Sequence, residues 1–251
     1  GYGAGTDNTT GQQNTFIGYQ AGAQATTADG CTVVGRFAGG AGAAMTGNLN
    51  TFVGNSAGAL MTSGNSNVAI GADSGANMAT TVGNTLVGFQ AGKALNYDGD
   101  SYNVIMGYQA GLSLTNAAYT TLIGGFAGDG YDTESHNTAV GYLALSGPVA
   151  GGEFNVCVGN YTGDAITSGD YNIGMGEYAL SSVNTGGSNI GIGRLAGSNN
   201  TSANSNMYIG YAAGYANQTG TSNTIVGNYS LSQTVGIVNF TNVTTLGWEA
   251  G

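Results

Sequence analysis

The stretch NTFIGYQAG at residues 14–22 recurs with small changes along the whole chain. It returns as NTFVGNSAG at 50–58, NTLVGFQAG at 84–92 and NVIMGYQAG at 103–111. Its central glycine, here called the repeat glycine, recurs every 17 residues apart from four insertions of one to three residues. The repeat glycines are Gly1, Gly18, Gly35, Gly54, Gly71, Gly88, Gly107, Gly124, Gly141, Gly159, Gly176, Gly193, Gly210, Gly227 and Gly247. A fixed short period that covers the entire sequence is typical of a solenoid.

The repeat favours strands over helices. Most 17-residue units carry glycine at two recurring positions, and each glycine would cost a helix about 1 kcal/mol. The residues one and three before the repeat glycine are Thr, Val, Ile, Leu or Met in nearly every copy. Residues two apart lie on the same face of a strand, so we expect these two columns to form an inward stripe. The sequence predicts an all-β, parallel β-solenoid (a β-roll) of about 14 coils.

The column between these two, two residues before the repeat glycine, is apolar as well. We expect it to point outward, and a strand that is apolar on both faces is buried on both. A single thin chain can bury its outer face only against another chain. The sequence therefore predicts an interchain seam of Phe16, Phe52, Leu86, Ile105 and Leu122, and hence a homo-oligomer.

Asparagine recurs four residues before the repeat glycine. Stacked asparagines at equivalent positions can form a ladder in which each side-chain amide donates to and accepts from its neighbours. The predicted ladder consists of Asn14, Asn50, Asn67, Asn84, Asn103, Asn137, Asn155, Asn172, Asn189, Asn206 and Asn223. Seven residues after the repeat glycine, apolar residues such as Met61, Met78 and Leu95 predict a second, weaker strand in each coil.

Aromatic residues follow the repeat glycine directly in many copies. Aromatic rings beside Asn and Arg can stack on sugar rings or fill a pocket of a partner. We therefore take Tyr19, Phe89, Tyr108, Tyr142, Tyr211 and Trp248 as candidates for surface binding, although the same rings could simply pack between subunits.

Charge and composition exclude several classes of function. Lys and Arg total 3 against 13 acidic residues, too few cations to follow a phosphate backbone, so we expect no nucleic-acid partner. No apolar run is long enough for a transmembrane helix. A single histidine, His136, leaves no recognisable metal site or catalytic triad, and we expect no metal and no cofactor. Cys31 and Cys157 are expected to be small buried residues.

Two alternative functions depend on specific residues. Glu153 and Asp170 occupy equivalent positions in adjacent coils, and two carboxylates about 5 Å apart are typical of a retaining glycosidase. We expect them instead in an open polar turn, and predict no enzymatic activity. A flat array of threonines could bind ice, but we expect the Thr column three before the repeat glycine to face inward.

The phrase Asn-Thr-x-aliphatic-Gly-x-x-Ala-Gly resembles the head repeats of trimeric autotransporter adhesins, and related repeats in phage and other viral tail fibres. The resemblance covers residues 1–251 and implies a parallel β-roll, three chains side by side and attachment to a surface. The repeat is longer than in those adhesin heads, so a triangular β-helix is the second candidate for its cross-section.

These observations predict one repeat domain over residues 1–251, forming a section of a longer fibre. We expect an extracellular structural or adhesive fibre segment, from a phage tail fibre or a bacterial surface adhesin. Its expected partners are copies of itself, as a trimer, and a glycan or protein receptor on a cell surface. A glycan-degrading tailspike-like enzyme and an ice-binding solenoid are the alternatives.

Overall fold

The computed structural model describes residues 1–40, 42–147, 151–232 and 239–251. The chain divides into two compact units, unit 1 at residues 1–125 and unit 2 at residues 126–251. Each unit is a parallel β-solenoid in which one three-residue strand recurs once per coil. The all-β class, the parallel β-solenoid and the repeat of about 17 residues are confirmed.

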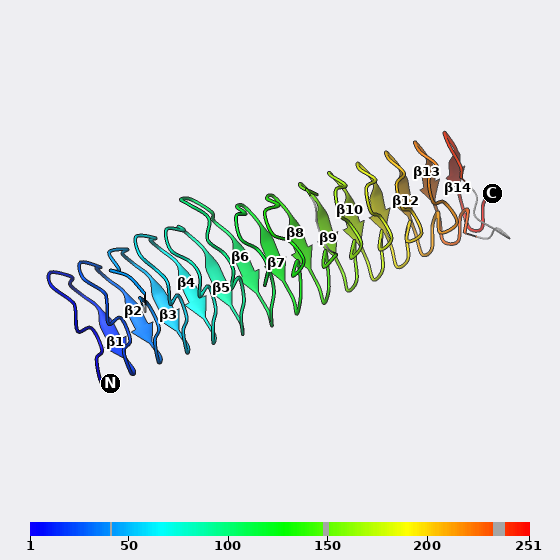
Figure 1. Ribbon diagram of the computed structural model, residues 1–251. Helices are drawn as coiled ribbons and strands as arrows, with labels where there is room; N and C mark the ends of the chain where they lie inside the picture. Colours follow the sequence, from blue (N-terminus) through cyan, green and yellow to red (C-terminus); the bar gives the residue numbers. More distant parts are fainter. Residues whose placement is uncertain (41, 148–150, 233–238) are drawn as a thin grey trace. The chain divides into compact units, whose positions relative to one another are not determined.

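Each unit contributes seven strands to the fold. Unit 1 contains β1 (Thr15–Ile17), β2 (Thr32–Val34), β3 (Thr51–Val53), β4 (Val68–Ile70), β5 (Thr85–Val87), β6 (Val104–Met106) and β7 (Thr121–Ile123). Unit 2 contains β8 (Thr138–Val140), β9 (Val156–Val158), β10 (Ile173–Met175), β11 (Ile190–Ile192), β12 (Met207–Ile209), β13 (Thr224–Val226) and β14 (Thr244–Leu246). Within each unit the strands lie side by side in chain order (Figure 1).

The repeat sets the register of every strand pair. Thr51 of β3 lies opposite Val68 of β4, and Phe52 lies opposite Ala69. Because the period is nearly constant, equivalent positions of successive repeats become neighbours in the sheet. Each column of the sequence therefore forms a row of contacting side chains in space.

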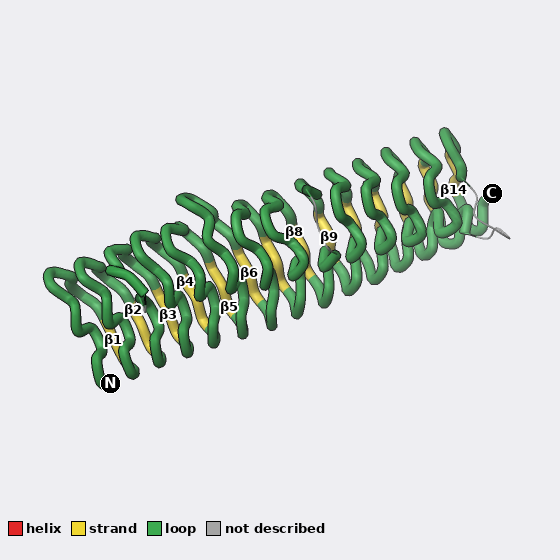
Figure 2. Tube along the Cα trace, viewed as in Figure 1, coloured by secondary structure: helices red, strands yellow, loops and turns green. Residues whose placement is uncertain are grey.

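The predicted second strand is wrong. Outside the fourteen strands, the described residues form turns and irregular backbone, drawn green in Figure 2, with two isolated β-bridges that join Ala25 to Met45 and Val82 to Asp100. The turns nevertheless hydrogen-bond from coil to coil: the N–H of Gly58 donates to Ser74, and that of Gly75 to Ala91, both at 3.0 Å. The side chains expected on that strand, such as Met61 and Leu95, are buried in the core.

The predicted inner and outer columns are exchanged. The residue two before the repeat glycine is the buried one in β2 to β13, whereas the residues one and three before it are half-buried or exposed. Both sets are apolar, and the period of two distinguishes the faces without saying which of them is inside. The buried asparagines four before the repeat glycine share the face of the buried column, which fixes that face as the core.

The interchain seam is consequently wrong as well. Phe52, Leu86, Ile105 and Leu122 are fully buried within their own chain, and Phe16 is half-buried in the first strand. Their burial is intramolecular, so they cannot line a contact between chains. The Thr column three before the repeat glycine, expected to face inward, faces outward instead.

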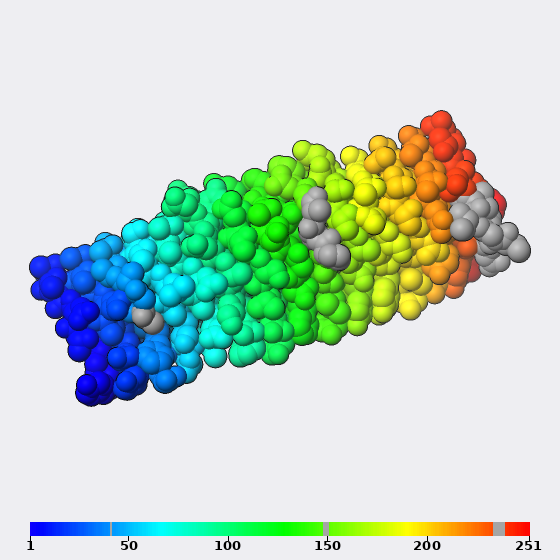
Figure 3. All heavy atoms as spheres, in the orientation of Figure 1, coloured from blue at the N-terminus to red at the C-terminus, as the bar shows by residue number. Residues whose placement is uncertain are grey.

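Glycine and alanine close each coil tightly around this core. Ala57 and Ala91, three after their repeat glycines, are completely buried. The repeat glycine Gly54 has a φ of 142°, and a Cβ there would collide with the backbone carbonyl of Gly71 in the next coil. Within each unit, side chains of successive coils fill the spaces between the ribbons (Figure 3). No helix in the described part of the chain could span a membrane.

Candidate functional site

The predicted asparagine column lies inside the solenoid. Ten of its eleven members are buried, and Asn14 is half-buried. In unit 2 the side-chain amide nitrogen of Asn172 donates to Oδ1 of Asn155 at 3.1 Å, and that of Asn189 donates to Oδ1 of Asn172 at 3.0 Å. Asn67 and Asn84 make the same bonds in unit 1. The ladder satisfies buried polar groups and stays inaccessible to ligands, so its role is structural.

The ladder also fixes the backbone on both sides of each amide. The backbone N–H of Asn189 donates to Oδ1 of Asn172 at 3.0 Å. The amide nitrogen of Asn189 donates in addition to the carbonyl of Ala203 at 2.8 Å. Each amide therefore joins its own strand to the strand before it and to the turn that follows.

The predicted surface aromatics lie at the surface. Tyr19, Phe89, Tyr108, Tyr142 and Trp248 are exposed, and Tyr211 is half-buried. Their rings contact aromatic neighbours in adjacent coils. Phe89 and Tyr108 are stacked with ring centroids 5.3 Å apart, and Tyr142 and Tyr161 meet edge to face at 5.6 Å.

Two further aromatic rows were missed by sequence reasoning. One lies two residues after the repeat glycine and includes Phe37, Phe126, Tyr161, Tyr178 and Tyr229. The other lies directly before the asparagine column and includes Tyr102, Tyr119, His136, Phe154 and Tyr171. All ten residues have positive φ, a conformation in which aromatic residues are not expected. The available signal was their recurrence at one repeat position in consecutive coils.

Ring orientation decides which aromatics can receive a ligand. In unit 2, His136 and Phe154 are parallel with centroids 4.7 Å apart, and Phe154 and Tyr171 are parallel at 5.1 Å. At that spacing each ring covers the face of the next, so a sugar cannot enter between them. Edge-to-face pairs leave a ring face uncovered. Tyr211 and Tyr229 form such a pair, at 4.8 Å and 88°.

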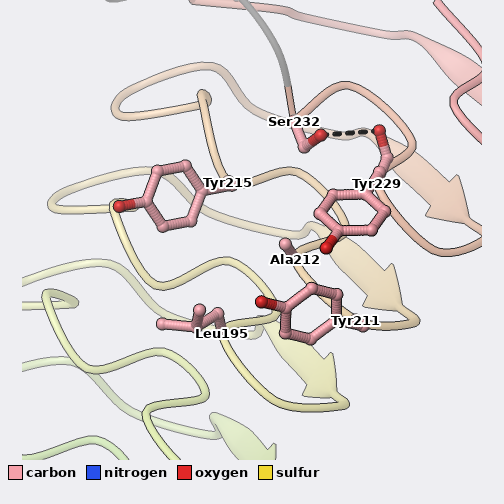
Figure 4. A pocket seen from close by; sticks show the side chains of 6 residues that line it. All are labelled: Leu195, Tyr211, Ala212, Tyr215, Tyr229 and Ser232. Atoms are coloured by element: carbon pink, nitrogen blue, oxygen red, sulfur yellow. Dashed lines mark hydrogen bonds between the residues drawn. The ribbon is translucent and has the colours of Figure 1, made fainter.

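A pocket of about 220 Å³ opens beside this pair in unit 2. Figure 4 shows Tyr215 on one side and Tyr211 with Tyr229 on the other. Leu195, Ala212 and Ser232 complete the lining, and the Ser232 hydroxyl donates to the backbone carbonyl of Tyr229 at 2.8 Å. Drug-sized ligands occupy about 300–1,000 Å³, so this smaller pocket suits one sugar ring or one side chain of a partner.

A cation lies next to the pocket. The Arg194 guanidinium donates to the hydroxyl of Tyr211 at 3.2 Å and to the Glu177 carboxylate at 2.8 Å. Both side chains of the ion pair are about half exposed, so its effect on stability is small. Hydrogen bonding with the Tyr211 side chain raises the pKa of Tyr229. The guanidinium also lies over the Tyr211 ring, 5.6 Å from its centroid. The pocket thus combines aromatic rings with hydroxyl groups that can bond a polar ligand.

The two carboxylates of the predicted pair, Glu153 and Asp170, accept hydrogen bonds from backbone N–H groups. Oδ1 of Asp170 accepts the N–H of Glu153 at 2.8 Å, and Oε1 of Glu153 accepts the N–H of Ser135 at 3.3 Å. Asp29 and Asn48 make equivalent contacts in unit 1. The column is therefore a second row of coil-to-coil hydrogen bonds, and neither carboxylate lines either of the two pockets described in this section.

Two buried titratable groups, Cys157 and Tyr131, lie in the core of unit 2, and the half-buried Asp164 lies near Cys157. Burial raises the pKa of the Cys157 thiol to about 12, and that of Tyr131 well above its usual value. Burial also raises the pKa of Asp164 to about 6. The Tyr131 hydroxyl and Oδ1 of Asp164 make no hydrogen bond within the described residues. Cys31 is buried too, and both cysteines are free thiols.

Asp164→Asn is expected to stabilise unit 2 at neutral pH. Because the folded-state pKa lies above the unfolded value of 3.8, the native state is disfavoured as pH rises from about 4 to about 6, and the penalty is constant above that. Allowing for partial exposure, we expect a gain of about 1–2 kcal/mol at pH 7 and almost none at pH 4. Urea unfolding at both pH values measures it, with the exposed Asp98→Asn as control. An equal gain at both pH values would contradict the assignment.

A second hollow, of about 420 Å³, lies in unit 1 between Leu60, Asn77, Ala94, Asn96, Thr115 and Asn116. No group of three or more potential metal-ligating side chains occurs among the described residues. Comparison with protein-family models, with curated proteins and with solved structures found no match to this chain. The site must therefore be interpreted from its own geometry.

Proposed function

We propose that this chain is a structural and adhesive segment of an extracellular fibre, which attaches to a host cell or surface. The supporting observation is that successive coils hydrogen-bond through strands, turns and asparagine ladder alike, while aromatic rings recur on the surface. Such a stack is rigid along its length and repeats weak surface contacts, which add up to avidity. The resemblance to trimeric autotransporter heads and to tail fibres supports the same role.

The receptor-binding part of this proposal is the pocket at Tyr211, Tyr215 and Tyr229. Its aromatic rings can contact the apolar face of a pyranose, and its hydroxyls can bond sugar hydroxyls. The parallel ring stacks elsewhere support the packing of coils. We therefore assign glycan binding to this pocket, while Tyr19, Phe89 and Tyr108 act chiefly in stacking.

Glycan cleavage is the less favoured function. A glycosidase needs one protonated carboxyl and one free carboxylate on either side of the substrate bond. Glu153 and Asp170 each accept a backbone N–H bond from the preceding coil, and neither lines either of the two pockets described above. We accordingly propose that the chain binds glycans without degrading them.

The test is binding of the purified chain to an array of cell-surface glycans. We expect Tyr211→Ala combined with Tyr215→Ala to weaken binding at least tenfold, since a lost ring contact is worth about 1 kcal/mol or more. The matched control is Phe89→Ala with Tyr108→Ala, which removes two exposed rings from a parallel stack.

Three outcomes would contradict the proposal. The chain could fail to bind any glycan or cell surface, or the control could lose binding as much as the pocket variant. Alternatively, incubation with polysaccharide could release shortened oligosaccharides, and this activity could disappear in Glu153→Gln. That last result would place the chain among glycan-degrading enzymes.

A further inference from the structure

Two tyrosines from adjacent coils are in contact on the surface of unit 1. Tyr102 and Tyr119 lie two residues before β6 and β7, at equivalent positions of the repeat. Their ring centroids are 6.0 Å apart, and the ring planes are inclined by 35°. The two residues are 50% and 52% exposed. A small oxidant in solution can therefore reach both phenols.

Backbone hydrogen bonds hold the two rings in register. The N–H of Tyr119 donates to the carbonyl of Ser101 at 2.7 Å, and the N–H of Thr120 donates to Oδ1 of the buried Asn103 at 2.9 Å. These acceptors directly precede and directly follow Tyr102 in the chain. The contact is thus fixed by the repeat. Rotation of the exposed side chains, which takes about nanoseconds or less, is all that is needed to bring the ring edges together.

A carboxylate lies beside one of the two phenols. Asp100 belongs to the acidic turn Asp98-Gly99-Asp100, which comes shortly before Tyr102 in the sequence. The Tyr102 hydroxyl donates to the Asp100 side chain, and this hydrogen bond raises the pKa of Tyr102. A phenol that loses one electron must also release its proton. A carboxylate that is already hydrogen-bonded to the phenol can accept that proton directly.

The equivalent row of rings in unit 2 shows that packing here does not require tyrosine. His136, Phe154 and Tyr171 stack in parallel at that repeat position, with centroids 4.7 Å and 5.1 Å apart. Phe154 lies between the other two rings and has no hydroxyl group, so this row cannot perform the chemistry of paired phenols. The two hydroxyls of the unit 1 pair therefore add a reactivity that ring stacking alone does not explain.

We propose that Tyr102 and Tyr119 form a modification site, at which a one-electron oxidant joins the two rings as dityrosine. Each phenol loses one electron and one proton, and the two tyrosyl radicals form a bond between ring carbons ortho to the hydroxyls. The hydrogens on those carbons then move to the oxygens, which restores both aromatic rings. The oxidant is hydrogen peroxide activated by a haem peroxidase. One peroxide molecule takes up the two electrons and two protons and becomes two water molecules.

The product is a covalent bond between neighbouring coils. It joins residues that are 17 positions apart in the chain. Such a bond restricts the unfolded chain in the same way as a disulfide and so favours the folded state. Both cysteines are buried free thiols, so the chain has no disulfide of its own to do this. The inference goes beyond the proposed function and does not depend on glycan binding.

Oxidation of the full chain at low concentration, with hydrogen peroxide and a haem peroxidase, tests the proposal. We expect dityrosine fluorescence, while the chain keeps the mass of a single copy on a denaturing gel. A protease that cuts before aspartate releases residues 100–128 as one peptide. This peptide should lose two hydrogens and give no fragment ions from cleavage between Tyr102 and Tyr119, because the cross-link holds that segment as a ring.

Three variants separate the groups involved. Tyr102→Phe keeps the ring but removes the phenol, and should abolish this cross-link. Asp100→Asn keeps the size of the side chain, and should slow cross-linking about tenfold because solvent must then take the proton. The matched control is Tyr108→Phe, which removes another exposed phenol of the same peptide, one that stacks on Phe89. We expect this control to cross-link like the original chain, and circular dichroism confirms that each variant is folded.

A second pair of tyrosines in unit 1 provides an internal comparison. Tyr2 and Tyr19 stack with centroids 5.8 Å apart, and neither has an acidic residue within two positions in the sequence. We expect this pair to cross-link more slowly than Tyr102 and Tyr119 in the original chain. The urea midpoint of the original chain should also rise more on oxidation than that of Tyr102→Phe.

Several results would overturn the inference. Oxidation could leave the peptide of residues 100–128 unchanged, or could join tyrosines only between separate chains. Tyr108→Phe could lower the yield as much as Tyr102→Phe, which would place the reactive phenol elsewhere. If Asp100→Asn reacts at the original rate, Asp100 is not the proton acceptor. Glycan binding is measured with variants of the pocket in unit 2, so neither experiment decides the other.

Discussion

Phe52→Ala is expected to lower the free energy of unfolding of unit 1 by about 3–5 kcal/mol. The Phe52 side chain is 0% exposed. Its ring lies against the corner glycines: a Cβ built on Gly58 would come within 2.7 Å of it, and one on Gly39 within 3.1 Å. Because backbone surrounds the ring on two sides, the cavity left by alanine cannot collapse readily.

Val53→Ala is the matched control for this prediction. Val53 is the next residue of the same strand, and its half-buried side chain lies on the face opposite the core. We expect its loss to cost under about 1 kcal/mol, since little buried apolar surface is removed. Urea unfolding followed by circular dichroism measures both values. A larger loss for Val53 than for Phe52 would show that the inner and outer columns are assigned the wrong way round.

The sequence was sufficient to predict the class of fold because the repeat is strict. The repeat glycine, the alanine three residues later and the second glycine must stay small where coils close on one another, and the period alone places equivalent residues in contact. Asparagine recurring at one position likewise predicts a ladder, since stacked amides can satisfy one another away from water. Both inferences require only which residues become neighbours.

The direction of each column could not be predicted in the same way. Phe52 and Val53 are both apolar, and either could face a core. What decides between them is the set of groups that share each face: Asn50 and Phe52 lie on one side, Thr51 and Val53 on the other. A buried ladder needs its amides inside, so Phe52 must be inside too.

The pocket was missed from the sequence for a different reason. Tyr211 and Tyr229 lie one and two residues after their repeat glycines and meet edge to face, as Tyr142 and Tyr161 do at the same two positions. Tyr161 and Tyr178, both two residues after their repeat glycines, stack in parallel at 4.9 Å. Ring orientation thus follows repeat position in these pairs, but nothing in the sequence marks the pair beside which a pocket opens. The turn that carries Tyr229 also has a positive φ, which sequence rules reserve mainly for glycine and asparagine.

Asn189→Ala is expected to destabilise unit 2 by about 3–5 kcal/mol, because it leaves several buried groups without partners. Oδ1 of Asn189 accepts the backbone N–H and the side-chain amide of Asn206, both at 3.1 Å. Its own amide bonds Asn172 and Ala203. The N–H of Asn206 and the carbonyl of Ala203 lie in the core, where water cannot replace the lost amide.

Asn204→Ala separates this effect from the loss of any asparagine. Asn204 also accepts a backbone N–H from the preceding coil, that of Gly187 at 2.7 Å, but its side chain is exposed. Water can take over its hydrogen bonds, so we expect a loss below about 1 kcal/mol. Asn189→Asp keeps the acceptor and loses the donor; it should be more damaging at pH 7 than near pH 4, since only the protonated carboxyl can donate. Thermal and urea unfolding of the three variants measure these differences. If Asn189→Ala and Asn204→Ala cost the same, the buried ladder contributes no more to stability than a hydrogen bond at the surface, and the coils are held together by apolar packing alone.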